Sequence, residues 1–184
     1  MTLDLHAGQI QGFFSIPGDV LTAFHILSDY FVKVRDRLQD PVIVTADLGF
    51  AKKGRNFAQK IDAGMAFIEK RRAGNDARAE AVTIIGRVQD RDVIIVDDEV
   101  DTAGSVSQAV EIVKEHGARD VYLSFVHPVL SPPAVERLRA LPIAQIVTTN
   151  TIPVPPEKRL PNMTILSVAP LLAEVIRRAH EGRS

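Results

Sequence analysis

One segment constrains this sequence more than any other: residues 93–105, which read VIIVDDEVDTAGS. The first four residues, 93–96, are apolar and mostly β-branched, which predicts a short buried strand. Carboxylates follow directly, and small residues then open a helical segment. In open α/β sheets, ligands bind outside the carboxyl ends of the strands. The segment therefore predicts a ligand site at that edge of a buried sheet.

The residue types that follow this strand suit a phosphorylated sugar and a metal ion. Free N–H groups at a helix start, with the positive end of the helix dipole, suit a phosphate, and Gly104 allows close approach. Thr102 and Ser105 add hydroxyl donors. Because carboxylates repel phosphate, we expect the acids to accept hydrogen bonds from sugar hydroxyls or to hold Mg2+. The alternative is that Asp101 or Thr102 only caps the helix while the other acids are solvated.

The composition is that of a globular protein. The chain has 184 residues, 46% hydrophobic and 24% charged, which fits one ordinary domain over residues 1–184. A formal net charge of -1 argues against a nucleic-acid partner, and the lack of cysteine excludes disulfides and thiolate zinc sites. The start has no signal-peptide pattern, and no apolar run approaches the roughly 18 residues of a membrane helix. We therefore expect a cytoplasmic protein with no membrane partner.

Apolar β-branched runs alternate with helically periodic segments, which predicts a parallel sheet covered by helices. A first helix is expected to start after Asp19, to keep apolar residues on one face as far as Leu38, and to end before Pro41. The expected strands are 42–45, 66–69, 82–85, 93–96, 121–126, 146–149 and 164–168. Further helices are expected at 51–61, from the small residues 102–105 to Gly117, at 131–141 and at 170–180.

Residues 70–79, KRRAGNDARA, have almost nothing to bury, so we expect a mobile polar loop. Lys70, Arg71 and Arg72 open it. Three consecutive basic residues are most often a solvated surface run, and that is the structural alternative to a functional role here.

Several segments carry a family resemblance. VDDEVDTAGS looks like the phosphoribosyl pyrophosphate signature of type I phosphoribosyltransferase folds, and nearly the whole chain is similar to the C-terminal part of the ribose-phosphate pyrophosphokinase family. The matching segments are DLHAGQIQGFF, IEKRRAGN, IIGRVQDRDVIIVDDEVDTAGS, VHPVLSPPAVERL, TNTIP and SVAPLLAEVIRRAH. The resemblance implies an α/β, type I phosphoribosyltransferase-like fold, with a mostly parallel sheet flanked by helices. It implies that the diphosphoryl group of ATP is transferred to ribose 5-phosphate in the presence of Mg2+, giving phosphoribosyl pyrophosphate and AMP.

The resemblance also implies roles for single residues. Lys70 matches the loop lysine taken as catalytic in the family, and Arg72 matches its ribose-phosphate or transition-state arginine. His6 and Asp47 match metal ligands, and Asp19 aligns with a family acid or only caps the first helix. Diphosphoryl transfer builds negative charge on oxygens, so positioned cations suit it. The residues expected to hold ribose 5-phosphate, besides Arg72, are Asp97, Asp101, Thr102, Ala103, Gly104 and Ser105.

The chain also departs from the family pattern. Ser15 stands where the family has an aspartate, and Phe50 replaces the second glycine of an Asp-x-Gly-Gly turn, where it is expected to crowd the pocket floor. The family's N-terminal domain, which supplies most ATP contacts, has no counterpart here, so residues 1–18 are expected to join such a domain or a separate partner chain. Activity of the chain alone is then doubtful. Two alternatives stay open: a non-catalytic regulatory or assembly subunit, and a phosphoribosyltransferase. A homo-oligomer is implied by the resemblance only.

Overall fold

The computed structural model describes residues 1–45, 50–72 and 80–183. Within them, seven strands form one sheet in the order β5-β4-β3-β6-β7-β8-β9. Neighbouring strands are parallel, except for the antiparallel pair of β4 and β5. This confirms the predicted α/β fold with a mostly parallel sheet. The strands are β3 (Val42–Thr45), β4 (Gly64–Arg72), β5 (Glu80–Ile85), β6 (Val93–Val100), β7 (Val121–Pro128), β8 (Gln145–Thr149) and β9 (Met163–Leu166).

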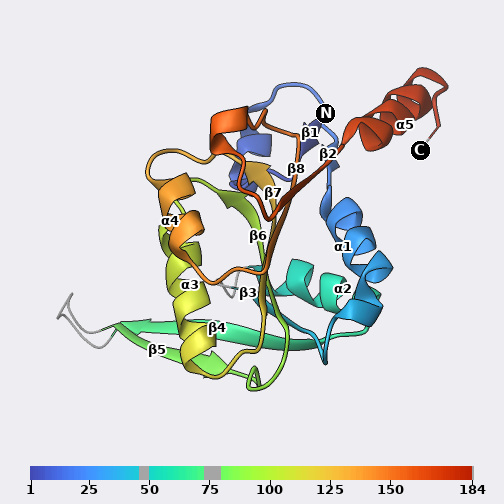
Figure 1. Cartoon of the computed structure of the whole chain (residues 1–184). Helices are drawn as coiled ribbons and strands as arrows, with labels where there is room; N and C mark the ends of the chain where they lie inside the picture. Colours follow the sequence, from blue (N-terminus) through green and yellow to red (C-terminus); the bar gives the residue numbers. More distant parts are fainter. Residues whose placement is uncertain (46–49, 73–79, 184) are drawn as a thin grey trace.

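Helices cover both faces of this sheet (Figure 1). On one face lie α3 (Gly104–Glu115) and α4 (Ala134–Ala140), and on the other lie α1 (Phe24–Lys33) and α2 (Ala51–Ile61). Strand β6 shows the reason. Val93 and Ile95 pack in the core under α3 and α4, whereas Ile94 and Val96 pack in the core under α1 and α2. Successive side chains of a strand alternate between faces, so a continuous apolar run serves both cores.

The N-terminal segment forms a small sheet of its own. Strand β1 (Thr2–Leu3) pairs in parallel with β2 (Val20–Leu21), and a 3-10 helix, η1 (Gly8–Phe13), lies between them. The prediction of a helix directly after Asp19 is therefore wrong, because residues 20–21 find a partner strand at the start of the chain. Helix α1 begins at Phe24, and the 3-10 turn η2 (Arg35–Arg37) follows it.

The predicted loop at residues 70–79 is wrong in its first three residues. Strand β4 continues to Arg72, because β5 pairs with it antiparallel, with Lys70 opposite Val82 and Arg72 opposite Glu80. The hairpin of β4 and β5 extends to one side of the molecule (Figure 1). Residues 73–79, the rest of the expected mobile loop, lie outside the described residues.

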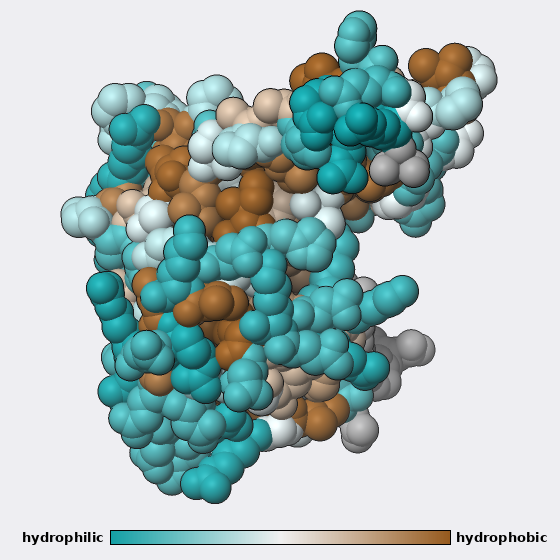
Figure 2. All heavy atoms as spheres, turned by 90° about the vertical axis from the view of Figure 1, so that its right-hand side faces the viewer, coloured by the Kyte–Doolittle hydropathy of each residue, from teal (hydrophilic) through white to brown (hydrophobic). Residues whose placement is uncertain are grey.

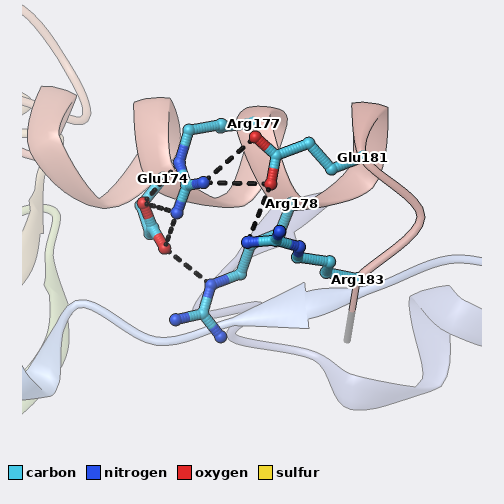
Figure 3. Close-up of polar contacts among 5 residues, drawn as sticks. All are labelled: Glu174, Arg177, Arg178, Glu181 and Arg183. Atoms are coloured by element: carbon cyan, nitrogen blue, oxygen red, sulfur yellow. Dashed lines mark hydrogen bonds and ion pairs between the residues drawn. The ribbon is translucent and has the colours of Figure 1, made fainter.

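Helix α5 (Ala169–His180) projects from the body near the N-terminus (Figure 1). Exposed carboxylate–guanidinium pairs link Glu174, Arg177, Arg178 and Glu181 along it (Figure 3). Hydrophobic areas interrupt the polar surface on the side that carries α1 and α5 (Figure 2). In residues 1–45, 50–72 and 80–183, no helix is long and apolar enough to cross a membrane. The larger exposed hydrophobic residues are Met1, Ile10, Phe13, Phe14, Ile16, Val20, Val32, Ile85 and Ile176.

Candidate functional site

A pocket of about 190 Å3 opens at the carboxyl end of β6, lined in the described part of the chain by His6 and residues 97–106. The structure thus brings together the acids and the helix start that the sequence singled out. One detail differs. Strand β6 continues to Val100, because Asp97 pairs with Phe125 of β7 and Val100 pairs with Pro128. Asp97, Asp98 and Glu99 therefore lie on the strand itself, which fixes their backbone.

The start of α3 forms the other wall of the pocket. Its N-cap residue is Ala103, in a left-handed conformation with φ of 61°, and no side chain caps the helix. The alternative that Asp101 or Thr102 merely caps α3 is therefore wrong. The Ala103 carbonyl accepts two hydrogen bonds from Ser107, at 2.9 Å from its N–H and 2.7 Å from its hydroxyl. The N–H groups of a helix's first turn have no partner within the helix, and such groups can bind an anion.

Two of the carboxylates stand at the pocket wall, Asp98 buried and Asp97 half-buried. Asp98 is 6% exposed, and its Oδ1 lies 3.1 Å from Nδ1 of His6. Asp97 accepts the backbone N–H of Asp98 at 2.9 Å. Burial raises the pKa of Asp97 to about 7, because water no longer stabilises the charged carboxylate. The pocket thus holds acidic side chains whose negative charge a bound cation would stabilise.

His6 reaches these acids because the N-terminal segment is anchored on both sides. The buried Asp4 accepts the N–H of Ala23 at 2.6 Å and donates its own N–H to Leu21 at 2.9 Å. The Asp4 carbonyl lies 3.0 Å from Nε2 of His127, on β7. The hydrogen bond to Asp98 raises the pKa of His6, since a nearby carboxylate favours the imidazolium. His6 is thereby held beside the acids, although its side chain is 66% exposed.

The expected metal ligands are only partly described. Nδ1 of His6 lies 3.9 Å from Glu99 Oε1, in addition to its contact with Asp98. Asp47 lies outside the described residues. Among the residues that the structure describes, no group of three or more His, Asp or Glu side chains is arranged to hold a metal. Mg2+ is usually bound through one or two carboxylates, with water and phosphate completing its shell, so the pocket acids fit this ion without such a cluster.

Several other predicted positions lie away from this pocket. The backbones of Lys70 and Arg72 lie on β4, two strands from β6 in the sheet. Ser15 and Asp19 are exposed, and the N-cap of α1 is Ala23, so Asp19 does not cap that helix. Phe50 does not belong to the described lining of the acidic pocket.

Phe50 instead packs against another aromatic ring. Its ring centroid lies 5.1 Å from that of Phe24, and Nζ of Lys53 lies 5.1 Å from both rings. The phenylalanine that replaces the family glycine at position 50 thus packs with α1 and α2. It carries no argument against a functional acidic pocket.

Two residues near the site make contacts that were not predicted from the sequence. Arg137 of α4 donates from Nη1 to the Thr102 carbonyl at 2.9 Å, across 35 positions in the chain. His127 follows a predicted strand and precedes a proline, which favours a hydrogen-bonded structural histidine, and it contacts Thr151 and Asp4. What could not be foreseen is that its Asp4 contact anchors the segment carrying His6. The only sequence signal for Arg137 is its place in the VHPVLSPPAVERL segment.

Comparisons with known proteins agree with this architecture. The family model of the phosphoribosyl synthetase-associated domain matches residues 73–184. A ribose-phosphate pyrophosphokinase of Caldanaerobacter subterraneus is 47% identical over the whole chain, which covers 58% of that protein. The crystal structure of phosphoribosylpyrophosphate synthetase from Mycobacterium smegmatis superposes with a TM-score of 0.88 and 36% identity, over 98% of this chain and 58% of that one.

A more distant likeness concerns the fold alone. An adenine phosphoribosyltransferase structure matches with a TM-score of 0.50 and 21% identity, over 68% of this chain and 78% of that one. The predicted phosphoribosyltransferase-like fold is therefore confirmed. The chain spans less than two thirds of the length of the curated relatives that it matches, and it belongs to the family of the phosphoribosyl synthetase-associated domain.

Proposed function

We propose that this chain provides the ribose 5-phosphate half of a ribose-phosphate pyrophosphokinase. One observation carries the proposal: a single pocket joins the carboxylates at the end of β6 to the start of α3. A sugar phosphate presents hydroxyls and a phosphate at its two ends, and this pocket offers acceptors and N–H donors in the same order. The names of the relatives support the same reading.

The residues have distinct roles in this proposal. The N–H groups from Ala103 to Ser105, with the hydroxyls of Thr102 and Ser105, bind the 5-phosphate. Asp97 and Asp101 accept hydrogen bonds from the ribose hydroxyls and orient its 1-hydroxyl.

Mg2+ would be held by Asp98 and His6, and by Asp47 outside the described residues. When bound, it supplies positive charge that offsets the charge of the phosphates. Lys70 and Arg72 would stabilise the charge on the transferred diphosphoryl group.

ATP binding and turnover require more than this pocket. The chain covers 58% of the Caldanaerobacter relative, so we assign most ATP contacts to the part of that relative which this chain does not span. A homo-oligomeric assembly and a cytoplasmic location belong to the same proposal. We therefore expect ribose 5-phosphate to bind to the chain alone, and AMP release to require the additional part.

Isothermal titration calorimetry of the chain with ribose 5-phosphate and Mg2+ tests the proposal. Saturable one-to-one binding is expected, together with little AMP release from ATP. The variant Lys70→Ala should bind ribose 5-phosphate as the wild type does, since its role is reserved for turnover. A chain that binds neither ribose 5-phosphate nor Mg2+ would contradict the proposal. Release of pyrophosphate from phosphoribosyl pyrophosphate in the presence of a base would favour a phosphoribosyltransferase instead.

A further inference from the structure

The turn that leads into α3 is strained at one residue. Ala103 has φ of 61° and ψ of 16°, a left-handed conformation that non-glycine residues adopt at a cost of about 1 kcal/mol. Such a residue keeps this conformation only when its surroundings hold it there. The contacts on both sides of Ala103 therefore decide whether the start of α3 keeps its shape.

The peptide groups on both sides of Ala103 are held by other residues. The carbonyl that follows its α-carbon accepts from the N–H and hydroxyl of Ser107, both within α3. The carbonyl that precedes it belongs to Thr102 and accepts from Nη1 of Arg137 at 2.9 Å. The second contact comes from α4 and connects two elements that are separate in the chain.

The contact with Arg137 also determines where the N–H of Ala103 points. The C=O and N–H of a trans peptide point in opposite directions, so a Thr102 carbonyl directed at Arg137 turns the Ala103 N–H away from α4. The pocket is lined by His6 and residues 97–106, none of them in α4, in the part of the chain that the structure describes. Arg137 thus holds the turn from outside the pocket.

The neighbouring glycine places the guanidinium close to the same turn. A Cβ built on Gly104 would lie 3.5 Å from Nη1 of Arg137, which is ordinary van der Waals contact. The positive charge therefore lies beside the first turn of α3 without occupying the pocket. A group in this position can hold the backbone donors in place and leave them free for a ligand.

We propose that Arg137 is a positioning residue for phosphate binding: it holds the Thr102 carbonyl and so keeps Ala103 left-handed at the start of α3. The importance of Arg137 for catalysis rests on the proposed function, but the effect of Arg137 on the turn does not. The ligand class is a phosphate monoester or inorganic phosphate, bound by the N–H groups that this turn presents.

Nuclear magnetic resonance of the 15N-labelled chain tests the inference without a ligand. The HN–Hα coupling constant of Ala103 reports its φ, and the amide shifts of Ala103 and Gly104 report the turn. Arg137→Met should move all three, and Arg137→Lys, which keeps a cationic N–H donor, should restore most of the change. Arg139→Met is the matched control, because it removes the same charge from the same helix. Unchanged signals in Arg137→Met, or equal changes in Arg139→Met, overturn the inference.

Titration with inorganic phosphate and with ribose 5-phosphate completes the test. Loss of this hydrogen bond should weaken both ligands about tenfold in Arg137→Met and leave Arg139→Met close to the wild type. Equal affinity in Arg137→Met and the wild type overturns the positioning role. If the wild type binds neither ligand, the proposed function fails, while the coupling constant of Ala103 still decides whether Arg137 holds the turn.

Discussion

Acidic residues lie at both ends of β6, but the protein groups that contact them differ. At the amino end, Asp92 is fully buried and accepts from Arg119 at 2.7 and 2.6 Å and from the N–H of Gln39 at 2.8 Å. At the carboxyl end, Asp97 and Asp98 face a pocket, and their basic neighbour among the described residues is the exposed His6.

The difference separates an acid that fixed protein groups neutralise from acids that line a pocket and that we propose bind a ligand. A buried carboxylate is tolerated when the protein supplies fixed donors and a cation, as it does for Asp92. At the carboxyl end, the acids Asp97 and Asp98 have fewer fixed hydrogen-bond donors and no guanidinium beside them among the described residues. Their carboxylate oxygens can therefore accept from a ligand or contact a cation. Substitutions at the amino end should therefore change stability, and substitutions at the carboxyl end should change binding.

The largest effect is expected at Asp92. Asp92→Ala leaves Arg119 and the Gln39 N–H without their partner, so the free energy of unfolding should fall by about 3 kcal/mol. Urea denaturation measures this. Affinity for ribose 5-phosphate should stay unchanged in buffer that keeps the variant folded.

Asp120 offers the matched control, because it also lies near Arg119, at 3.7 Å, but is 48% exposed. Asp120→Ala should leave the unfolding curve close to that of the wild type, since exposed ion pairs contribute little. A comparable loss in both variants would mean that burial does not distinguish the two acids.

Much of the fold and of the pocket at the carboxyl end of β6 could be foreseen from the sequence, because local patterns encode them, whereas the partners of Asp92 could not. The apolar run 93–96 and the helix at Ala51–Ile61 were predicted at their observed positions, since apolar spacing determines which residues face the core. The site acids and the small residues that open α3 are contiguous in the chain, so one segment was enough to indicate the pocket.

The errors arose where a distant segment supplies the partner. Residues 20–21 form a strand because Thr2 and Leu3 pair with them, and Arg72 is in a strand because Glu80 lies opposite. Apolar spacing predicted a helix at the first place and polar composition predicted a loop at the second, and strand pairing across the fold overrides both. The contact of Arg137 with Thr102 is equally non-local, so no periodic pattern could reveal it.

The second prediction concerns the pH dependence of stability at the carboxyl end. Asp97 holds its proton to about pH 7 in the folded protein, while its ordinary pKa is 3.8. Unfolding therefore releases a proton between these values, and stability should fall as pH rises from 4 to 7. Relative to Asp97→Asn, the wild type should lose roughly 2 kcal/mol between pH 5 and 7. Denaturant unfolding at several pH values measures the difference.

Two control measurements show whether Asp97 is the source of this pH dependence. Asp120→Asn makes the same substitution at an exposed carboxyl group, and it should keep the pH dependence of the wild type. Added Mg2+ should reduce the dependence in the wild type, because a nearby cation favours the ionised carboxylate. Parallel curves for the wild type and Asp97→Asn would show that burial does not raise this pKa.

The third prediction tests binding at Asp98. Asp98→Asn removes a negative charge beside His6, so ribose 5-phosphate should bind about tenfold more weakly in the presence of Mg2+. Stability should not fall, since the amide still offers an oxygen acceptor. Calorimetric titrations with and without Mg2+ separate the two possible roles. A loss seen only with Mg2+ assigns the carboxylate to the metal, and an equal loss in both assigns it to the sugar.

The smallest effect is expected at α5, where the same pair chemistry is exposed. Arg178 Nε lies 2.7 Å from Glu174 Oε1, as close as Arg119 Nε lies to Asp92 Oδ1 at the amino end of β6. The hydrogen bonds from Arg178 and Arg177 lower the pKa of Glu174. Solvent screens such a pair, and ordering two long side chains offsets the attraction. A double-mutant cycle of Glu174→Gln and Arg178→Met should therefore show coupling near the detection limit, and 1 M salt should remove it.

The corresponding cycle of Asp92→Asn and Arg119→Met should show clear coupling that salt barely changes, because the carboxylate is buried. Since the Nε–carboxylate distance is 2.7 Å in both pairs, the length of that contact does not explain the difference in coupling. Equal coupling in both cycles would remove the basis for treating the amino end of β6 as structural. Among the described residues, no guanidinium is fixed beside the pocket acids. Burial alone would then not account for this difference between the two ends of the strand.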